Sequence, residues 1–151
     1  MSESFAALVA AVQLKMNANH DALREVVRGL SADALNWQPA PETNSICALV
    51  SHALDAERFL LATTLDHVVA RDRESHFRAT TASAADLLAL IDRAVAENEE
   101  LLSRVTEDRM AAVVTRPGRT YNGAWWLLQA VEHTREHIGH AQLTRQLWEA
   151  R

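Results

Sequence analysis

The segment GAWWLLQAVEHTREHIGHAQLTRQLWEA, residues 123–150, predicts one long amphipathic helix. On a helix with about 100° per residue, His133, His137 and His140 fall within a sector of about 60°. The same face carries the apolar residues Trp126, Ala130, Ala141 and Leu147. Burying several imidazoles is costly unless each finds a partner, and one metal ion satisfies several ring nitrogens at once. The pattern therefore predicts a buried helix face that offers metal ligands.

The rest of the chain also favours helices, because its 151 residues include only four glycines and three prolines. Apolar residues at three- and four-residue steps predict long helices over about residues 4–29, 45–70 and 84–105, the last two capped by Asn44 and Ser83. A short helical turn is expected after Ser31, and Pro117 and Gly118 mark a turn. We therefore predict an all-α fold, an up-and-down four-helix bundle, with a single domain over residues 1–151.

Composition excludes several classes of function. The net charge is −5, which argues against nucleic-acid binding. The sequence contains no run of about 18 apolar residues, the length that a helix needs to span a membrane. Cys47 is the only cysteine and cannot form an intramolecular disulfide. It lies about 140° around the helix from His52 and is expected to be a small buried hydrophobe. With no signal-peptide pattern, these features predict a cytoplasmic protein that binds a small-molecule substrate.

A metal site needs more than the pair His133 and His137. His52 lies on the apolar face of the second predicted helix. In an up-and-down bundle the second and fourth helices run the same way, and the three histidines then lie about 12 to 22 Å from the same end. They would form a three-histidine site with open positions for water, a thiolate or a substrate. His140 could replace His133 as the partner of His137 or line the pocket.

Other polar residues have alternative interpretations. His20 and His76 lie on polar stretches, and we expect both to face solvent. Asn19 and Asn98 interrupt apolar stripes and are predicted to line the metal pocket. The alternative is that each asparagine sets helix register or bonds to the backbone or to a second copy of the chain.

The connections before the second and fourth helices are both expected at the end of the bundle nearest the metal. They offer a set of possible residues at the mouth of the pocket: Trp37, Arg116, Arg119, Tyr121 and Trp125. The arginines could pair with an anionic thiol. Alternatively, they are ordinary surface residues and the tryptophans serve only in packing.

Two segments carry a family resemblance: LNWQPAPETNSICALVSHALDAERFLL, residues 35–61, and GAWWLLQAVEHTREHIGHAQLTRQLW, residues 123–148. Together they resemble the DinB/YfiT-like family. The resemblance implies a four-helix bundle that holds one divalent metal ion through His52, His133 and His137. Relatives often have Arg-Gly-Gln after the last ligand, and His140 occupies the position of that glutamine, where it could become a fourth ligand.

Relatives in this family include bacillithiol and mycothiol S-transferases and a mycothiol-dependent maleylpyruvate isomerase. The resemblance therefore implies a metal-dependent thiol S-transferase, or a related hydrolase or isomerase, with zinc or nickel and a low-molecular-weight thiol as co-substrate. One alternative is a non-catalytic stress-response binding protein that the metal stabilises. Another is a metal-free bundle with hydrogen-bonded core histidines.

The chain is also expected to be a homodimer. Leu127, Val131 and Ile138 are apolar and lie away from the histidine face of the last helix. The alternative is that these residues pack on the first and third helices of the same chain.

Overall fold

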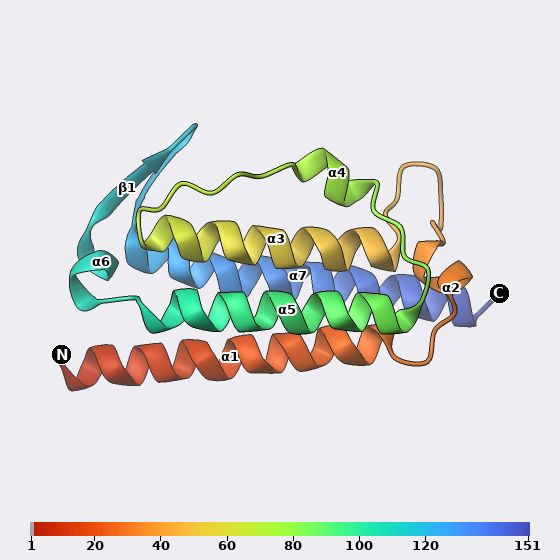
Figure 1. Cartoon of the computed structure of the whole chain (residues 1–151), viewed down its shortest axis with the longest axis horizontal. Helices are drawn as coiled ribbons and strands as arrows, with labels where there is room; N and C mark the ends of the chain where they lie inside the picture. Colours follow the sequence, from red (N-terminus) through yellow and green to blue (C-terminus); the bar gives the residue numbers. More distant parts are fainter. Residues whose placement is uncertain (1) are drawn as a thin grey trace.

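Four long helices lie side by side and form the body of the molecule (Figure 1). They are α1 (Glu3–Val27), α3 (Ile46–Thr64), α5 (Ala84–Ser103) and α7 (Gly123–Glu149). The structure is a computed structural model and describes residues 2–151. It confirms the predicted all-α four-helix bundle. In the described part of the chain, no helix combines the length and hydropathy that crossing a membrane requires.

Short elements fill the connections: α2 (Ala32–Asn36), α4 (Arg73–Phe77), α6 (Glu107–Ala111), β1 (Val113–Arg116) and β2 (Arg119–Asn122). The two strands form an antiparallel hairpin in which Arg116 pairs with Arg119. Gly118 at its tip has φ +77°, a conformation that side chains rarely adopt. The predicted turn and the helical turn after Ser31 are confirmed. The strands, α4 and α6 were not predicted, because four or five residues are too few for a periodic pattern.

Polar residues cap the N-termini of the long helices, where each side chain accepts a hydrogen bond from a free backbone N–H group. The Ser83 hydroxyl accepts from Asp86 N at 3.1 Å, as predicted. The N-cap of α3 is Ser45, whose hydroxyl accepts from Ala48 N at 3.1 Å. The prediction of Asn44 as this cap is therefore wrong by one residue.

Helices α1 and α7 run in one direction, and α3 and α5 run in the other. One apolar cluster joins Phe5 at the start of α1 to Leu102 at the end of α5, and Leu61 near the end of α3 to Leu127 near the start of α7. The expected up-and-down alternation of the helices is therefore wrong. The connection before α3 and the hairpin before α7 lie at opposite ends of the bundle (Figure 1), not together at one end.

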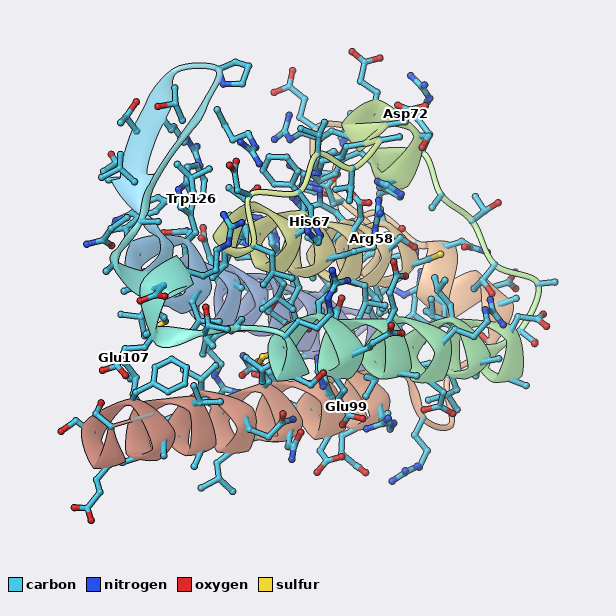
Figure 2. All side chains as sticks on the ribbon, turned by 60° about the vertical axis from the view of Figure 1, so that its left-hand side comes forward. Arg58, His67, Asp72, Glu99, Glu107 and Trp126 are labelled. Atoms are coloured by element: carbon cyan, nitrogen blue, oxygen red, sulfur yellow. The ribbon has the colours of Figure 1, made fainter. Side chains whose placement is uncertain are left out.

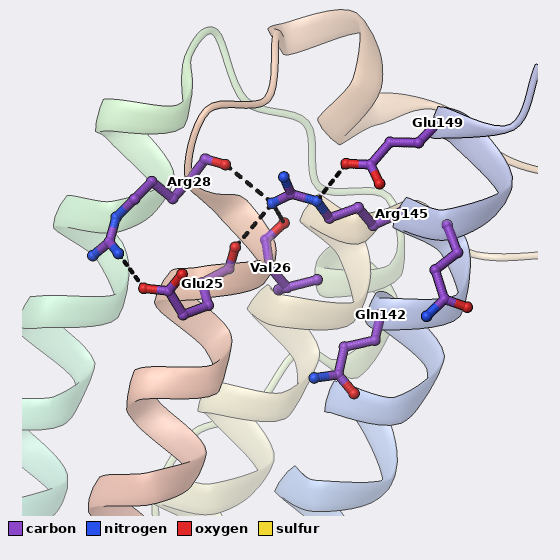
Figure 3. A pocket seen from close by; sticks show the side chains of 7 residues that line it. Glu25, Val26, Arg28, Gln142, Arg145 and Glu149 are labelled. Atoms are coloured by element: carbon purple, nitrogen blue, oxygen red, sulfur yellow. Dashed lines mark hydrogen bonds and ion pairs between the residues drawn. The ribbon is translucent and has the colours of Figure 1, made fainter.

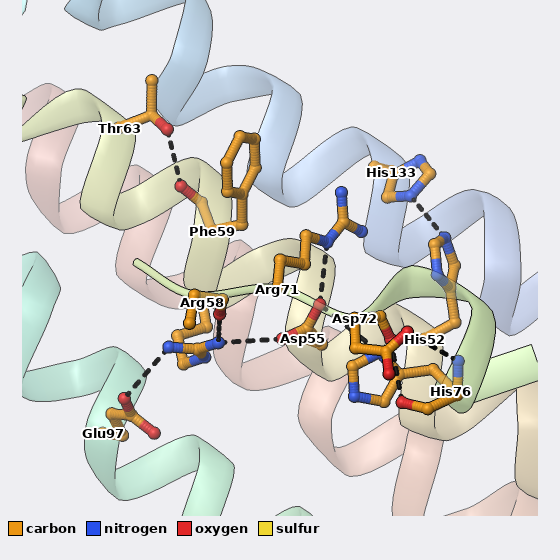
Figure 4. Close-up of polar contacts among 12 residues, drawn as sticks. His52, Asp55, Arg58, Phe59, Thr63, Arg71, Asp72, His76, Glu97 and His133 are labelled. Carbon is orange, nitrogen blue, oxygen red and sulfur yellow. Dashed lines mark hydrogen bonds and ion pairs between the residues drawn. The ribbon is translucent and has the colours of Figure 1, made fainter. Parts of the chain in front are cut away.

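The parallel order of α3 and α5 depends on the crossover, residues 65–83. Helix α3 ends at Thr64, earlier than the expected end near Ala70, and Asp66 then turns the chain with φ 59°. The crossover returns along the outside of α3 and carries α4 (Figure 1). Arg71 fixes it to α3 by donating from Nε to Asp55 at 2.7 Å (Figure 4). The crossover thus covers one side of α3.

A polar layer lies between the two apolar clusters of the core. Its centre is the fully buried carboxylate of Glu57, which accepts from Asn98 Nδ2 and Thr134 Oγ1, both at 2.8 Å. His20 Nε2 lies 2.6 Å from the same carboxylate. Each of the four long helices contributes one of these residues. His20 is 1% exposed, so the prediction that it faces solvent is wrong.

The asparagines bond within the core. Asn98 belongs to the polar layer, and Asn19 Nδ2 donates to the backbone oxygen of Val131 at 3.0 Å. Their amide groups therefore fix neighbouring helices to one another. This is the alternative interpretation of both residues, and the prediction that they line the metal pocket is wrong.

The end of α1 is closed by a side chain from α7. Arg145 donates to the backbone oxygens of Glu25, Val26 and Arg28 at 2.9 to 3.3 Å, and its Nε donates to Glu149 (Figure 3). The last carbonyl groups of a helix lack partners within the helix, and here a guanidinium group supplies them. A cavity of about 670 Å³ lies around Arg145, and the polar groups of Arg145 and of the end of α1 in it are already bonded to one another.

The apolar residues expected at a dimer interface pack within the chain. Leu127 and Ile138 are fully buried in the two core clusters, and Val131 is half-buried. These residues therefore give no support to a homodimer, which stays a prediction. Cys47 is buried in the second cluster, as expected, and burial raises the pKa of its thiol.

Candidate metal centre

Three histidines from two helices meet on one side of the bundle. His52 comes from α3, and His133 and His137 are one turn apart on α7. The Nε2 atoms of His52 and His133 are 3.2 Å apart (Figure 4), and each of the three residues offers a ring nitrogen within 4.8 Å of the other two. Two nitrogens on one tetrahedral zinc ion lie about 3.3 Å apart. The three side chains are therefore positioned to hold one metal ion.

The histidines meet although α3 and α7 run in opposite directions. His52 lies six residues into α3, and His133 lies ten residues into α7, so both are well inside the bundle. The spacing of four residues then places His137 beside the same point. The expected parallel direction of the two helices is wrong, but the expected grouping of the three histidines is present.

Burial keeps these imidazoles neutral. It is the main cause that lowers the pKa of His52 to about 3 and that of His137 to about 4. The positive charges of Arg71 and Arg73 lower the pKa of His52 further. The pKa of His133 is lowered as well, again mainly by burial. At neutral pH the ring lone pairs are therefore available to a metal ion.

The donor set fits a divalent ion. Among residues 2–151, both ring nitrogens of His137 and the Nδ1 of His52 are buried without a hydrogen-bond partner. Such groups normally find a partner in a folded protein. Three neutral imidazoles suit zinc, nickel, copper or iron. A bound ion would give His137 the partner that the protein does not supply.

We expect the metal-free protein to lose stability as the pH falls below about 6.5. Unfolded histidines take up protons near that pH, whereas folded His52 and His137 resist protonation until about pH 3 and 4. Between these values the unfolded state binds more protons, so the free energy of unfolding falls by up to about 1.4 kcal/mol per pH unit for each histidine. Urea denaturation at several pH values measures this slope. A His137→Gln variant should show a shallower slope, and equal slopes in both proteins would contradict the burial argument.

A cleft of about 710 Å³ opens beside His52 and His133. Phe59 and Trp126 form apolar parts of its wall, and Gln129 and Glu136 of α7 also face it. Trp126 lies below the hairpin (Figure 2), and its Nε1 donates to Val114 O at 3.3 Å. A small molecule in this cleft would lie directly against the histidines.

Four arginines surround the cleft, and two of them were predicted. Arg116 and Arg119 of the hairpin line it, as expected. Arg71 and Arg73 of the crossover line it as well and were missed by sequence reasoning. Their segment, RDRESHF, residues 71–77, is charged and directly follows the expected end of the second helix near residue 70, and nothing in its pattern indicates a binding role. Phe77 in the same segment stacks on His52, with ring centroids 4.3 Å apart.

Other predicted pocket residues lie elsewhere. Tyr121 and Trp125 stack on each other, with ring centroids 3.8 Å apart, and do not line the cleft. Trp37 packs against Trp148 at the C-terminal end of α7. The prediction that these three lie at the mouth of the pocket is therefore wrong. For the tryptophans, the packing alternative describes the structure better.

The remaining histidines do not join the metal centre. His140 is exposed; its ring centroid lies 5.7 Å from that of His137, and the group of possible ligands does not include it. His76 is half-buried instead of facing solvent, with Nδ1 3.5 Å from the Asp55 carboxylate. The histidine group is thus limited to His52, His133 and His137 in the described part of the chain.

Comparisons with known proteins show the family and the fold of the chain. The family model described as DinB superfamily matches residues 15–141. No curated protein matches the chain. Among solved structures, a conserved protein from Enterococcus faecalis has a TM-score of 0.78 at 15% identity and covers 94% of this chain and 97% of its own. A DinB-like protein from Bacillus subtilis has a TM-score of 0.65 at 22% identity, covering 85% and 84%.

A third similar structure is that of a mutant of the mycothiol-dependent maleylpyruvate isomerase. Its TM-score is 0.65 at 13% identity, and the match covers 86% of this chain and 59% of that one. At these identities the solved structures show a shared fold.

Proposed function

Because the chain belongs to the DinB superfamily, we propose that it is a metal-dependent enzyme that activates a low-molecular-weight thiol, or water, for transfer to a small electrophile. The observation that carries the proposal is the group of three neutral histidines, of which His52 is buried and His133 is half-buried, beside an open cleft. A structurally similar protein is a mycothiol-dependent isomerase. The ion is proposed to be zinc or nickel, held by His52, His133 and His137.

The chemistry follows from the ligands. A divalent ion bound there would lower the pKa of a coordinated thiol or water and supply a nucleophile near neutral pH. Three protein ligands leave coordination positions for a substrate, as in catalytic zinc sites, whereas structural sites usually have four. Phe77 stacks on the His52 ring and holds its orientation. The cleft gives a thiol and an electrophile room beside the ligands.

The proposal includes a reducing, cytoplasmic setting, in which small thiols and the free Cys47 remain reduced. The alternative is a binding protein in which the ion only ties α3 to α7. The open cleft favours the enzyme, because a structural ion needs no access for a second molecule.

Thiol consumption tests the proposal. The protein reconstituted with zinc or nickel should accelerate the reaction of bacillithiol, mycothiol or glutathione with monochlorobimane. We expect His133→Ala to lose at least about hundredfold in rate, since a catalytic ion held by two ligands is bound more weakly. His67→Ala, at an exposed position outside the histidine group, is the matched control. Metal binding without any thiol reaction would favour the binding protein.

A further inference from the structure

The arginines around the cleft come from both of its sides. Arg71 and Arg73 lie on the crossover, and Arg116 and Arg119 lie on the hairpin. Segments distant in sequence therefore bring four guanidinium groups to one small cleft. Such groups recognise carboxylates and phosphates by paired hydrogen bonds.

Two of these arginines already have acidic partners. Arg71 is bonded to Asp55 at 2.7 Å, and Arg116 lies 3.1 Å from the Asp66 carboxylate. Within residues 2–151, Arg73 and Arg119 form no ion pair with a carboxylate. Arg73 packs its guanidinium against the Phe77 ring, 4.9 Å from the centroid. One free positive charge thus remains on each side of the cleft.

The acidic groups of the cleft do not balance this charge. Glu136 is the only carboxylate among its lining residues. It is 60% exposed and lies 4.0 Å from His133 Nδ1. A divalent ion on three neutral imidazoles would add two further positive charges. An anionic ligand is the natural complement of such a site.

The walls indicate an organic ligand. Phe59 supplies apolar surface, and the Arg71 guanidinium stands over its ring at 5.1 Å. The volume of about 710 Å³ is in the range of pockets for small molecules. A carbon skeleton can therefore contact the Phe59 ring while charged ends reach the arginines.

We propose that the cleft binds a small organic co-substrate with two anionic groups, carboxylate or phosphate, and that Arg73 and Arg119 select it. The inference names the substrate class of the site in the proposed function and rests on that proposal for its role in a reaction. Binding itself does not require the reaction. By linkage, a divalent ion and such an anion raise each other's affinity by the same factor.

Calorimetric titration of the metal-free and the zinc-loaded protein tests this inference. The probes are succinate, 3-phosphoglycerate, butyrate with one charge, and neutral succinamide. We expect succinate or 3-phosphoglycerate to bind at least about tenfold more tightly than butyrate, and butyrate more tightly than succinamide, because each charged hydrogen bond adds about this factor. Succinate carries two carboxylates, whereas 3-phosphoglycerate carries one carboxylate and one phosphate with more than two negative charges. The one that binds more tightly identifies the preferred pair of anionic groups.

The arginine variants locate the binding. Arg73→Gln and Arg119→Gln should each lower the affinity for succinate or 3-phosphoglycerate about tenfold and leave the affinity for succinamide unchanged. Arg78→Gln is the matched control, because Arg78 lies on the same crossover, is exposed and does not line the cleft. Equal affinities for all four probes would overturn the inference. So would unchanged affinities for succinate and 3-phosphoglycerate in both cleft variants.

The two proposals fail in different ways. A protein that consumes thiol with zinc but does not discriminate between the probes would retain the proposed function and refute the anion site. A protein that binds dianions through Arg73 and Arg119 but binds no metal would refute the proposed function and retain the anion site.

Discussion

Replacing His52 with alanine is expected to remove stoichiometric metal binding. His52 is the only one of the three histidines on α3, so the variant leaves a two-residue site on one helix. Loss of a residue that merely contacts a metal ligand typically costs 10–100-fold in affinity, and loss of a ligand should exceed about hundredfold. Elemental analysis after reconstitution and gel filtration, followed by competition with a chelator, measures the effect.

The control for this experiment is His76→Ala, a half-buried histidine on the same side of α3 that lies outside the group of possible ligands. It should retain the metal content of the unchanged protein. Circular dichroism should show equal helix content in both variants. One ion per chain in folded His52→Ala at unchanged affinity would show that the site is wrongly assigned.

The second large effect is expected from Glu57→Ala, which should lower the free energy of unfolding by at least about 3 kcal/mol. The change leaves the donors of Asn98 and Thr134, and the His20 ring, buried without their acceptor. Each buried group that loses its partner costs about 1–3 kcal/mol, and the removed side chain leaves a cavity. Urea denaturation of the metal-free protein provides the value.

Thr134→Val separates the loss of a hydrogen bond from the creation of a cavity. It removes one donor and keeps the side-chain volume nearly constant, so the expected loss is about 1 kcal/mol. A Glu57→Ala protein within about 1 kcal/mol of the unchanged chain would mean that the polar layer contributes little to stability.

The helices and the histidine group could be predicted because their signals are local. Apolar periodicity defines the four long helices, and the spacing of His133 and His137 places both on one face. His52 could be added because it lies on the buried face of its own helix. The periodicity and the histidine pair need no knowledge of how distant segments pack, whereas the level of His52 was inferred from parallel helices, which is wrong for α3 and α7.

The helix directions could not be predicted, because periodicity is the same in either direction. The 19 residues from 65 to 83 can extend about 60 Å, twice the length of α3 at about 28 Å. A connection of this length permits α5 to run parallel or antiparallel to α3. The packing of Arg71 on Asp55 and of Phe77 on His52 shows the path that the chain takes.

The hydrogen-bond partners of the buried polar residues could not be predicted from the sequence either. His20 lies in a polar stretch, NANHD, and nothing near it in sequence indicates burial. Its partner Glu57 is 37 residues away, on another helix. Asn19 and Asn98 were correctly identified as unusual, but which group each one bonds depends on how all four helices meet.

The most direct test of the metal centre is anomalous X-ray scattering at the zinc or nickel edge, from crystals of the reconstituted protein. The account predicts one peak per chain, about 2.0 to 2.1 Å from a ring nitrogen of each of His52, His133 and His137. A peak at other residues, or no peak from protein that was shown to be folded and exposed to excess metal, would contradict it.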